Sequence, residues 1–330
     1  MTSTPAGTAA DKGIVRWGIV GCGDVTEIKS GPALQKADRS ELISVMRRDA
    51  EKAADYAERH NVPSWTADAD ELINNPDISA IYIATPPSTH ADFTIKALEA
   101  GKHVLTEKPM ALDLNECNRM AAAATATGNK LCVAYYRRAL PRFEKLREIV
   151  QDGTIGTPRM VEVRHFLPES ARPAQAWKLN PQVGGGGFFP DMQTHTLDWL
   201  TYVFGEPDAV KGLTKHQAGH YAAEDLVNYL VDFGDVTALG LCAYATGRQE
   251  ESVTVHGSKG SASMGFFRPS AINLEIDGTS ETIELSDPPH VHQPFVERVI
   301  AHILDDAPNP CSPEDGRRST EIMRTIYSGL

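Results

Sequence analysis

The stretch Gly-Cys-Gly-Asp-Val-Thr at residues 21–26 follows directly on a short apolar run at residues 14–20. A strand that turns on glycine into a helix directs the free amides of that helix at a bound anion, often the pyrophosphate of a dinucleotide. Thr26 stands where the dinucleotide fingerprint has its third glycine, so a glycine-rich turn without a ligand is the alternative interpretation. The expected cofactor contacts from this turn are Gly21, Gly23, Asp24 and Val25.

Short strands are predicted to alternate with longer helices after this turn. The predicted strands are 42–46, 80–84, 103–106 and 130–134, and the predicted helices are 50–60, 90–100 and 114–127. Alternation of this kind predicts a parallel sheet with right-handed crossovers. We therefore expect a doubly wound α/β domain in the first half of the chain.

The end of the second strand selects the cofactor in such a domain. An acidic residue there accepts hydrogen bonds from the ribose hydroxyls of NAD, whereas arginine accommodates the 2′-phosphate of NADP. The sequence places Arg47 in this position, with Arg48 and Asp49 after it. We predict NADP on the basis of both arginines, and NAD remains the alternative if Asp49 turns toward the ribose.

Two later strand ends carry the other candidate residues of this domain. The segment after residues 80–84 reads Thr85-Pro86-Pro87, and the two prolines fix an extended path that suits a wall for a flat ring. Lys108 follows the strand at 103–106, at the carboxyl edge where open α/β sheets bind ligands.

Composition limits the possible partners. The chain has 330 residues and a formal charge of −12, without the clustered lysines and arginines that bind nucleic acid. The five cysteines are scattered without metal-type spacing, so we expect reduced thiols, no metal and a cytoplasmic location. No signal peptide or membrane span is expected, and residues 1–13 are interpreted as a disordered tail.

In the second half, Asp191 and His195 are four residues apart on a predicted helix and should share one face. An imidazole titrating near neutrality, oriented by a carboxylate such as Asp198, suits a general acid or base. Strands rich in hairpin turns follow from residue 209 and predict a large, mostly antiparallel sheet. The sheet face without helices is expected to form a homodimer or homotetramer.

These motifs, in this order, resemble the Gfo/Idh/MocA (glucose-fructose oxidoreductase, inositol dehydrogenase) family. The similar segments are Gly21-x-Gly23, Ala84-Thr85-Pro86, His90, residues 100–104, Glu107-Lys108-Pro109 and Asp191-x-x-x-His195. The resemblance implies an N-terminal Rossmann domain, placed here at 14–134. It also implies a C-terminal α/β domain with a large, mostly antiparallel open sheet for substrate binding and oligomerisation, placed at 135–330.

The resemblance also implies roles for individual residues. His195 would be the acid/base, Lys108 would stabilise the alkoxide, and Asp191 would fix a substrate hydroxyl and pair with Lys108. The implied cofactor contacts include Thr85, Pro86, Pro87, His90, Glu107, Lys108 and Trp177. Tyr136 and Gln193 are the predicted substrate contacts, and Gln193 replaces a glycine that is frequent in the family.

The function predicted from this set is an NADP(H)-dependent oxidoreductase. It would transfer hydride between the nicotinamide and a secondary alcohol or ketone carbon of a sugar, anhydrosugar or cyclic polyol. Two alternatives remain open: a glycosidase that oxidises its sugar transiently with NAD, and a cofactor-sensing regulator without catalysis.

Overall fold

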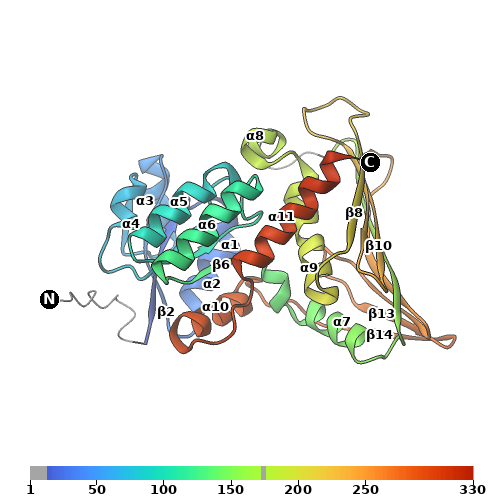
Figure 1. Ribbon diagram of the computed structural model, residues 1–330. Helices are drawn as coiled ribbons and strands as arrows, with labels where there is room; N and C mark the ends of the chain where they lie inside the picture. The colour runs from blue at the N-terminus through green and yellow to red at the C-terminus, as the bar shows by residue number, and fades with distance from the viewer. Residues whose placement is uncertain (1–12, 172–175, 330) are drawn as a thin grey trace. The chain divides into compact units, whose positions relative to one another are not determined.

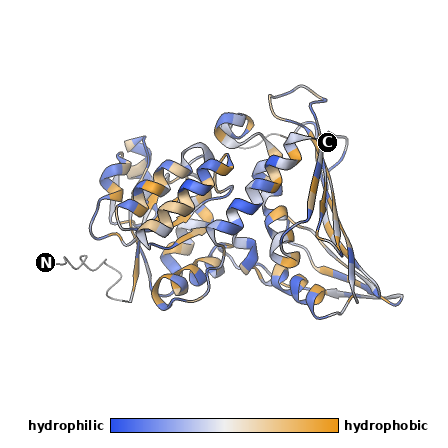
Figure 2. Ribbon diagram, in the orientation of Figure 1, coloured by the Kyte–Doolittle hydropathy of each residue, from blue (hydrophilic) through white to orange (hydrophobic). Residues whose placement is uncertain are grey.

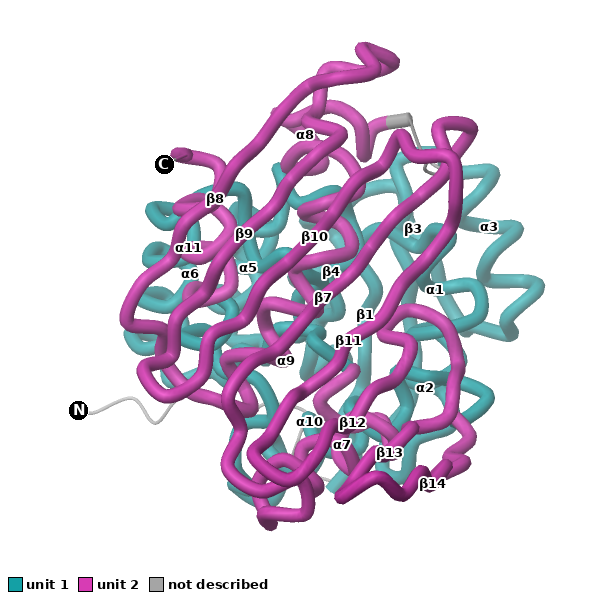
Figure 3. The backbone as a smooth tube through the Cα atoms, turned by 90° about the vertical axis from the view of Figure 1, so that its right-hand side faces the viewer, with its two compact units in different colours: residues 1–136, 288–316 teal, residues 137–287, 317–330 magenta. Residues whose placement is uncertain are grey.

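The computed structural model describes residues 13–171 and 176–329 (Figure 1). The predicted disordered tail therefore lies outside the described residues except for Gly13. The chain divides into two compact units, shown in Figure 3. Unit 1 comprises residues 1–136 and 288–316, and unit 2 comprises residues 137–287 and 317–330.

Unit 1 is built on a 6-stranded parallel sheet in the order β3-β2-β1-β4-β5-β6. Its strands are β1 (Val15–Val20), β2 (Ser40–Met46), β3 (Ser64–Thr66), β4 (Ala80–Ile83), β5 (His103–Thr106) and β6 (Leu131–Val133). Its helical segments are α1 (Asp24–Ile28), α2 (Ser30–Lys36), α3 (Ala50–Arg59), α4 (Ala69–Ile73), η2 (Pro87–Thr89), α5 (His90–Glu99), α6 (Leu114–Thr127) and α10 (Gln293–Asp305). This strand order is that of a Rossmann domain, which confirms the predicted class.

Burial explains why these residues form these elements. All four residues of β4 are buried, as expected for a central parallel strand covered on both faces. The buried residues of α3 are Ala53, Tyr56 and Ala57, spaced three and four positions apart so that they form one helix face. Figure 2 shows the corresponding alternation of hydrophilic and hydrophobic residues along the helices.

The elements β3 and α4 are among those that the sequence-based prediction did not contain. β3 has only three residues, two of them exposed, so it offers no alternation to detect. It pairs with β2, with Ser64 opposite Ser44 and Thr66 opposite Met46, and it forms one edge of the sheet.

Residues 288–316 lie in unit 1, whereas the sequence-based division assigned them to the second domain. α10 contacts α2 and β1 of the Rossmann sheet. Its C-terminal end is also tied there, because the guanidinium of Arg39 binds Asp305 and Lys130 Nζ binds Asp306 Oδ1 at 2.8 Å. These long-range contacts, which leave no local sequence signal, explain the difference.

Unit 2 is built on an 8-stranded sheet in the order β14-β13-β12-β11-β7-β10-β9-β8. Its strands are β7 (Pro158–Pro168), β8 (Ala209–Lys215), β9 (Leu226–Asp232), β10 (Thr237–Thr246), β11 (Glu250–Gly257), β12 (Gly260–Met264), β13 (Ile272–Ile276) and β14 (Thr279–Ile283). Only the β7–β10 pair is parallel among these described strands, so the sheet is mostly antiparallel, as predicted.

The helical segments of unit 2 precede most of this sheet in the chain. They are η3 (Tyr136–Ala139), whose first residue belongs to unit 1, α7 (Pro141–Gln151), η4 (Ala176–Leu179), α8 (Pro181–Gly184), the π-helical turn η5 (Phe189–Gln193) and α9 (Thr194–Phe204). α11 (Pro313–Ser328) begins in unit 1 and continues into unit 2.

The two faces of the unit 2 sheet differ in burial. On β9 and β10, buried residues such as Val227 and Cys242 alternate with more exposed ones. Leu213, Leu239 and Leu241 are 38–44% exposed, although they are large and apolar. Such residues suit the surface proposed for a homo-oligomer, which stays a prediction. Within the described residues, no helix is long and apolar enough to cross a membrane.

The strand β12 is shorter than its sequence pattern indicates. In the strand-rich region after residue 209, the sequence predicts a strand at 261–267, but β12 ends at Met264. The residues that follow turn around the Glu251 carboxylate, which accepts hydrogen bonds from the amides of Phe266, Phe267 and Arg268. Because these amides are bound to a side chain, they cannot continue the strand ladder.

A buried ion pair fixes α9 in unit 2. Arg138 Nη2 lies 2.7 Å from Asp198 Oδ1, its Nε lies 3.0 Å from Oδ2, and both side chains are at most 5% exposed. Removing one member of such a pair leaves the other charge buried without compensation. The pair therefore holds η3 and α9 together.

We expect the Asp198→Leu substitution to destabilise the protein by about 3–5 kcal/mol because Arg138 loses its counter-charge. The midpoint of urea unfolding, followed by circular dichroism, measures this loss. The matched control is Glu321→Leu, which breaks the Arg317–Glu321 pair on α11, where both side chains are partly exposed. That change should cost less than about 1 kcal/mol, and equal losses in both variants would contradict the assignment.

Candidate active site

The turn between β1 and α1 can be formed only with glycine at residue 21. Gly21 has a φ of +94°, and a Cβ there would lie 2.7 Å from the methyl group of Thr85 and 3.0 Å from its amide nitrogen. A Cβ at Gly23 would make only an ordinary contact, 3.9 Å from Gly21 O. The absence of side chains brings the turn against the end of β4 and leaves its backbone open to a ligand.

Thr26 occupies the place of the third fingerprint glycine, and its role is visible in the hydrogen bonds. Its hydroxyl accepts from Gly23 N at 3.0 Å and donates to Gly23 O at 2.7 Å, which closes the turn. Close packing comes instead from Gly31, where a Cβ would lie 2.3 Å from both Thr26 O and the Tyr56 hydroxyl. The sequence analysis did not identify Gly31 or Tyr56, because both residues lie outside the spacing of the dinucleotide fingerprint.

Asp24 and Val25 form the first residues of α1, with Asp24 exposed and Val25 half-buried. Between the two glycines, Cys22 is only 1% exposed. Burial raises the pKa of its thiol to about 11, against a smaller opposite effect of Arg47. Cys22 is therefore an unreactive thiol at neutral pH.

The three residues after β2 have distinct positions. Arg47 is half-buried, and its Nη1 donates to the Cys22 carbonyl at 3.3 Å. Arg48 is exposed. Asp49 caps α3 by accepting from Lys52 N at 3.2 Å, and its other oxygen lies 3.1 Å from Lys52 Nζ. The guanidinium of Arg47 is thus held at the glycine turn, while the Asp49 carboxylate is engaged by α3.

His90 connects two of the predicted cofactor loops. Its Nε2 lies 2.8 Å from Thr85 O, and its Nδ1 lies 3.0 Å from Pro109 O. The ring is completely buried, and this burial lowers its pKa. Any effect of His90 on a cofactor would therefore pass through these loops. Pro86 and Pro87 lie beside them, and the Thr89 hydroxyl donates to Pro86 O at 2.9 Å.

Glu107 is a buried carboxylate with three neighbours in unit 1. The Tyr82 hydroxyl donates to its Oε1 at 2.5 Å, Lys108 N donates to its Oε2 at 3.2 Å, and His292 Nδ1 lies 3.9 Å away. Burial, followed by the Glu107 charge, raises the pKa of Tyr82 far above its usual range. Lys108, which follows β5 and Glu107 in the chain, is half-buried.

Tyr136 was a predicted substrate contact, and the structure places it in unit 1. It is 7% exposed and stacks on His292, with ring centroids 4.1 Å apart. Its ring therefore has an aromatic partner, and direct contact with a substrate stays a prediction.

In unit 2, the segment with the Asp191 and His195 pair is not a regular helix. η5 (Phe189–Gln193) is π-helical, and the α-helix begins only at Thr194. The α-helical spacing used to place both side chains on one face therefore does not hold across this turn, and such π turns are common at functional sites. His195 is 5% exposed.

Asp191 pairs with Lys178, whose Nζ lies 2.8 Å from its Oδ2. The sequence analysis did not identify Lys178 as a partner of Asp191, and its pairing of Asp191 with Lys108 of unit 1 stays a prediction. Trp177 is half-buried, with the Lys178 ammonium 5.8 Å from its ring centroid. Gly187 N donates to Lys178 O at 2.7 Å, which ties the glycine run to this lysine.

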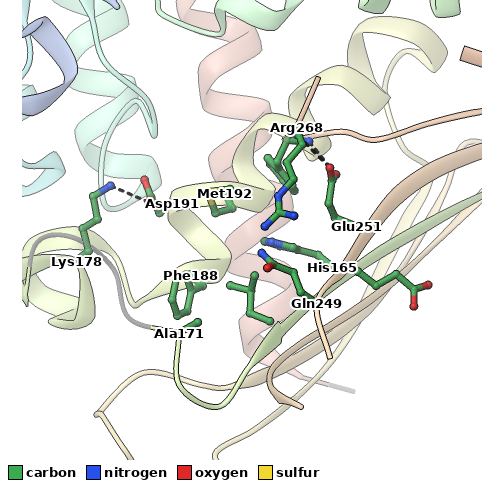
Figure 4. Close-up of a pocket in the computed structure, with 12 residues that line it drawn as sticks. His165, Ala171, Lys178, Phe188, Asp191, Met192, Gln249, Glu251 and Arg268 are labelled. Carbon is green, nitrogen blue, oxygen red and sulfur yellow. Dashed lines mark hydrogen bonds and ion pairs between the residues drawn. The ribbon is translucent and has the colours of Figure 1, made fainter. Parts of the chain in front are cut away.

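A cavity of about 360 Å³ opens beside this ion pair within unit 2 (Figure 4). Lys178, Asp191 and Met192 line one part of it, and His165 of β7 lines another. Acidic and basic residues at the start of β11 and after β12 complete the wall; they are Glu250, Glu251 and Arg268. The sequence analysis did not single out His165 or Arg268, because they are far apart in the chain.

Gln193 was a predicted substrate contact, and direct contact with a substrate stays a prediction. It is completely buried, its Nε2 lies 3.2 Å from His165 Nδ1, and it accepts from the Tyr229 hydroxyl at 3.3 Å. Gln193 is therefore connected to the cavity through its hydrogen bond to His165, which lines the cavity.

Comparison with known proteins assigns the family. Residues 15–135 match the family described as "Oxidoreductase family, NAD-binding Rossmann fold", and residues 143–263 match the "GFO/IDH/MocA C-terminal domain". The chain belongs to the Gfo/Idh/MocA family of oxidoreductases.

Three similar proteins illustrate the range of this family. "Oxidoreductase P35" of Formosa agariphila is 35% identical over 315 residues, 94% of this chain and 97% of its own. A 1,5-anhydro-D-fructose reductase of Ensifer adhaerens is 32% identical over 251 residues, 74% of each chain. The crystal structure of aldose-aldose oxidoreductase from Caulobacter crescentus, complexed with glycerol, has a TM-score of 0.85 at 27% identity and covers 96% of this chain and 97% of its own.

His165 should remain neutral at physiological pH, because burial lowers its pKa to about 4. NMR of protein with ¹³C-labelled histidine rings measures this directly, with the His165 signal assigned by its loss in His165→Gln. Titration near or above the usual value of about 6.5 would contradict the burial.

The same shift has a consequence for stability. Because the unfolded chain binds the His165 proton more readily than the folded chain, folding stability should decrease as the pH falls from about 6.5 toward 4. Above about pH 6.5, the folding stability no longer depends on the protonation of His165.

Proposed function

We propose that this protein is an NADP(H)-dependent oxidoreductase acting on a secondary alcohol or ketone carbon of a sugar, anhydrosugar or cyclic polyol. The observation that carries the cofactor choice is the position of Arg47 at the glycine turn, bonded to Cys22 O at 3.3 Å. Its guanidinium supplies planar donors for a phosphate.

The alternative, an acidic residue for the ribose hydroxyls of NAD, has Asp49 as its candidate in this segment. That carboxylate accepts from Lys52 N, and interaction with Lys52 lowers its pKa. Turning it toward a ribose would remove the cap of α3 and its ion pair. The arrangement of both residues therefore supports NADP over NAD.

The described residues fit a dinucleotide. The open backbone at Gly23, the close approach of Gly21 to Thr85 and the arginine at the end of β2 supply the turn, the contact and the cation that such a cofactor needs. When bound, the nicotinamide would supply or accept the hydride.

The chain would supply the proton chemistry. His195 would exchange a proton with the substrate hydroxyl, and the Lys108 ammonium would stabilise negative charge as it develops on the same oxygen. Asp191, held by Lys178, would accept a hydrogen bond from a substrate hydroxyl. The Arg138–Asp198 pair would keep α9, and with it His195, in a constant position.

The similar proteins support the substrate class. One is named for reduction of an anhydro sugar and another for oxidation and reduction of aldoses. A carbohydrate or polyol substrate is consistent with the oxygen-directed polar groups proposed above.

We expect Arg47→Asp to shift the preference from NADPH toward NADH by roughly 10- to 100-fold, because it removes a charge-assisted bond to the 2′-phosphate. The ratio of kcat/KM for the two nucleotides measures this shift. Arg119→Asp is the control, since Arg119 is an exposed arginine on α6, and it should leave the ratio unchanged. An unchanged ratio in Arg47→Asp would contradict the assignment of Arg47.

We expect Lys108→Met and His195→Ala each to lower turnover at least about 100-fold, while NADPH still binds with its fluorescence change. Lys96→Met, which removes an exposed lysine of α5, is the control and should keep normal turnover. Normal activity in the two site variants would refute these roles. Release of free sugar from a glycoside without net change in NADPH absorbance would identify a glycosidase instead.

A further inference from the structure

The acidic residues around the unit 2 cavity are already compensated. Glu251 accepts hydrogen bonds from three backbone amides, those of Phe266, Phe267 and Arg268. Glu250 pairs with Arg248 and with Arg164, the latter at 3.3 Å. Asp191 pairs with Lys178 at 2.8 Å, so the charge of this lysine is compensated as well. These carboxylates therefore add little uncompensated negative charge to the cavity.

Arg268 is the remaining charged residue in the lining of the cavity. Its backbone amide binds Glu251, but within residues 13–171 and 176–329 no carboxylate pairs with its guanidinium. In Figure 4 the guanidinium extends toward the ends of His165 and Gln249, and all three residues line the same cavity. An arginine with its donors directed into a cavity is a site for an anion with planar oxygen acceptors.

His165 supplies a second donor. With the Gln193 amide oriented so that the Tyr229 hydroxyl donates to its oxygen, Gln193 Nε2 donates to His165 Nδ1. The imidazole, neutral because of its burial, then carries its hydrogen on Nε2. The residue is 2% exposed and lines the cavity, and its Nε2 has no hydrogen-bond partner among the described residues.

We propose that this cavity binds the carboxylate of a sugar acid, with the Arg268 guanidinium and the His165 Nε2–H as its donors. The proposal rests on the proposed function and narrows its substrate class to uronic or aldonic acids and their keto forms. The carboxylate would anchor the sugar in unit 2 at the cavity that Asp191 also lines.

Charge matching favours a carboxylate over a phosphate. One unpaired guanidinium and one neutral imidazole compensate a single negative charge. A phosphate monoester carries nearly two at neutral pH. Binding a phosphate monoester here would leave about one negative charge without a counter-charge, which is unfavourable in a partly enclosed cavity.

The arginine is presented by a rigid turn. Besides the three bonds to Glu251, the carbonyl of Gly265 accepts from Arg142 Nη1 at 2.6 Å, and that of Phe266 accepts from Arg137 Nη1 at 2.7 Å. Ser270 Oγ accepts from Gly265 N at 2.7 Å. Because the turn is ordered before any ligand arrives, little backbone entropy would be lost on binding.

The histidine is held in a comparable way. Gly240 pairs with Tyr229 across β10 and β9, and a Cβ at Gly240 would lie 2.0 Å from the Tyr229 ring. The glycine therefore leaves room for the ring whose hydroxyl orients Gln193, and Gln193 in turn sets the hydrogen on His165.

The test compares matched sugars with the wild-type protein and Arg268→Gln. D-glucuronate and D-galacturonate are paired with D-glucose and D-galactose, and glucose 6-phosphate is the phosphate probe, each assayed with NADP(H). The wild type should prefer the acids, and Arg268→Gln should reduce the acid-to-neutral ratio of kcat/KM by roughly 10- to 100-fold. Arg159→Gln, which alters an exposed arginine of β7 outside the cavity lining, should leave the ratio unchanged.

A second readout does not depend on turnover. Calorimetric titration of D-glucuronate should give a Kd that rises by a similar factor in Arg268→Gln and stays unchanged in Arg159→Gln. Loss of glucuronate binding in Arg268→Gln without turnover of any sugar would support the carboxylate site and refute the proposed function.

Two results would overturn the carboxylate site and leave the proposed function intact. One is equal turnover of acidic and neutral sugars with an unchanged ratio in Arg268→Gln. The other is a preference for glucose 6-phosphate over both uronates.

Discussion

The close approach of the β1–α1 turn to the end of β4 is the constraint on which the cofactor half of the molecule depends. Gly21 lies so near Thr85 that any side chain would collide with it. The same contact brings Arg47, through Cys22 O, and His90, through Thr85 O, to one region of the sheet edge. Because residue 21 has no side chain, three strand ends can lie close together. This explains why a glycine occupies position 21 in preference to a better strand former.

In unit 2 the governing constraint is the compensation of charge away from water. Asp198 has Arg138, Asp287 has Arg142, and the Glu251 carboxylate has three backbone amides. Buried charges without partners are unfavourable, so such pairs are expected wherever carboxylates enter the core. Against this background, Arg268 is an exception, because no carboxylate among residues 13–171 and 176–329 pairs with its guanidinium, and this difference supports the proposed anion site.

The agreement between sequence and structure is strongest where periodic burial is long. β1, β4, β5 and the helices after them could be predicted because three or more buried residues in a run, or a helical spacing of three and four, leave a clear pattern. β3 could not, since it has three residues and one buried side chain. The end of β12 was missed because the carboxylate of Glu251, fifteen or more positions away in the chain, binds the amides that follow the strand.

The site shows the same division. Sequence spacing and family resemblance identified the turn at Gly21, the arginine after β2, the lysine after β5 and the Asp191–His195 segment as candidates. The partners of these groups lie far away in the chain, so local patterns contained no information on them. Lys178 for Asp191, Asp198 for Arg138, and Gln193 with Tyr229 for His165 are tertiary pairings.

The amino-acid sequence alone determined the class of fold, the family and the chemical types available at the sheet edge, because these depend on local periodicity and on short motifs. The tertiary structure alone decided which charges are compensated and which donors face a cavity. Compensation depends on distances of about 3 Å between groups from separate parts of the chain, and only the folded chain brings those groups together.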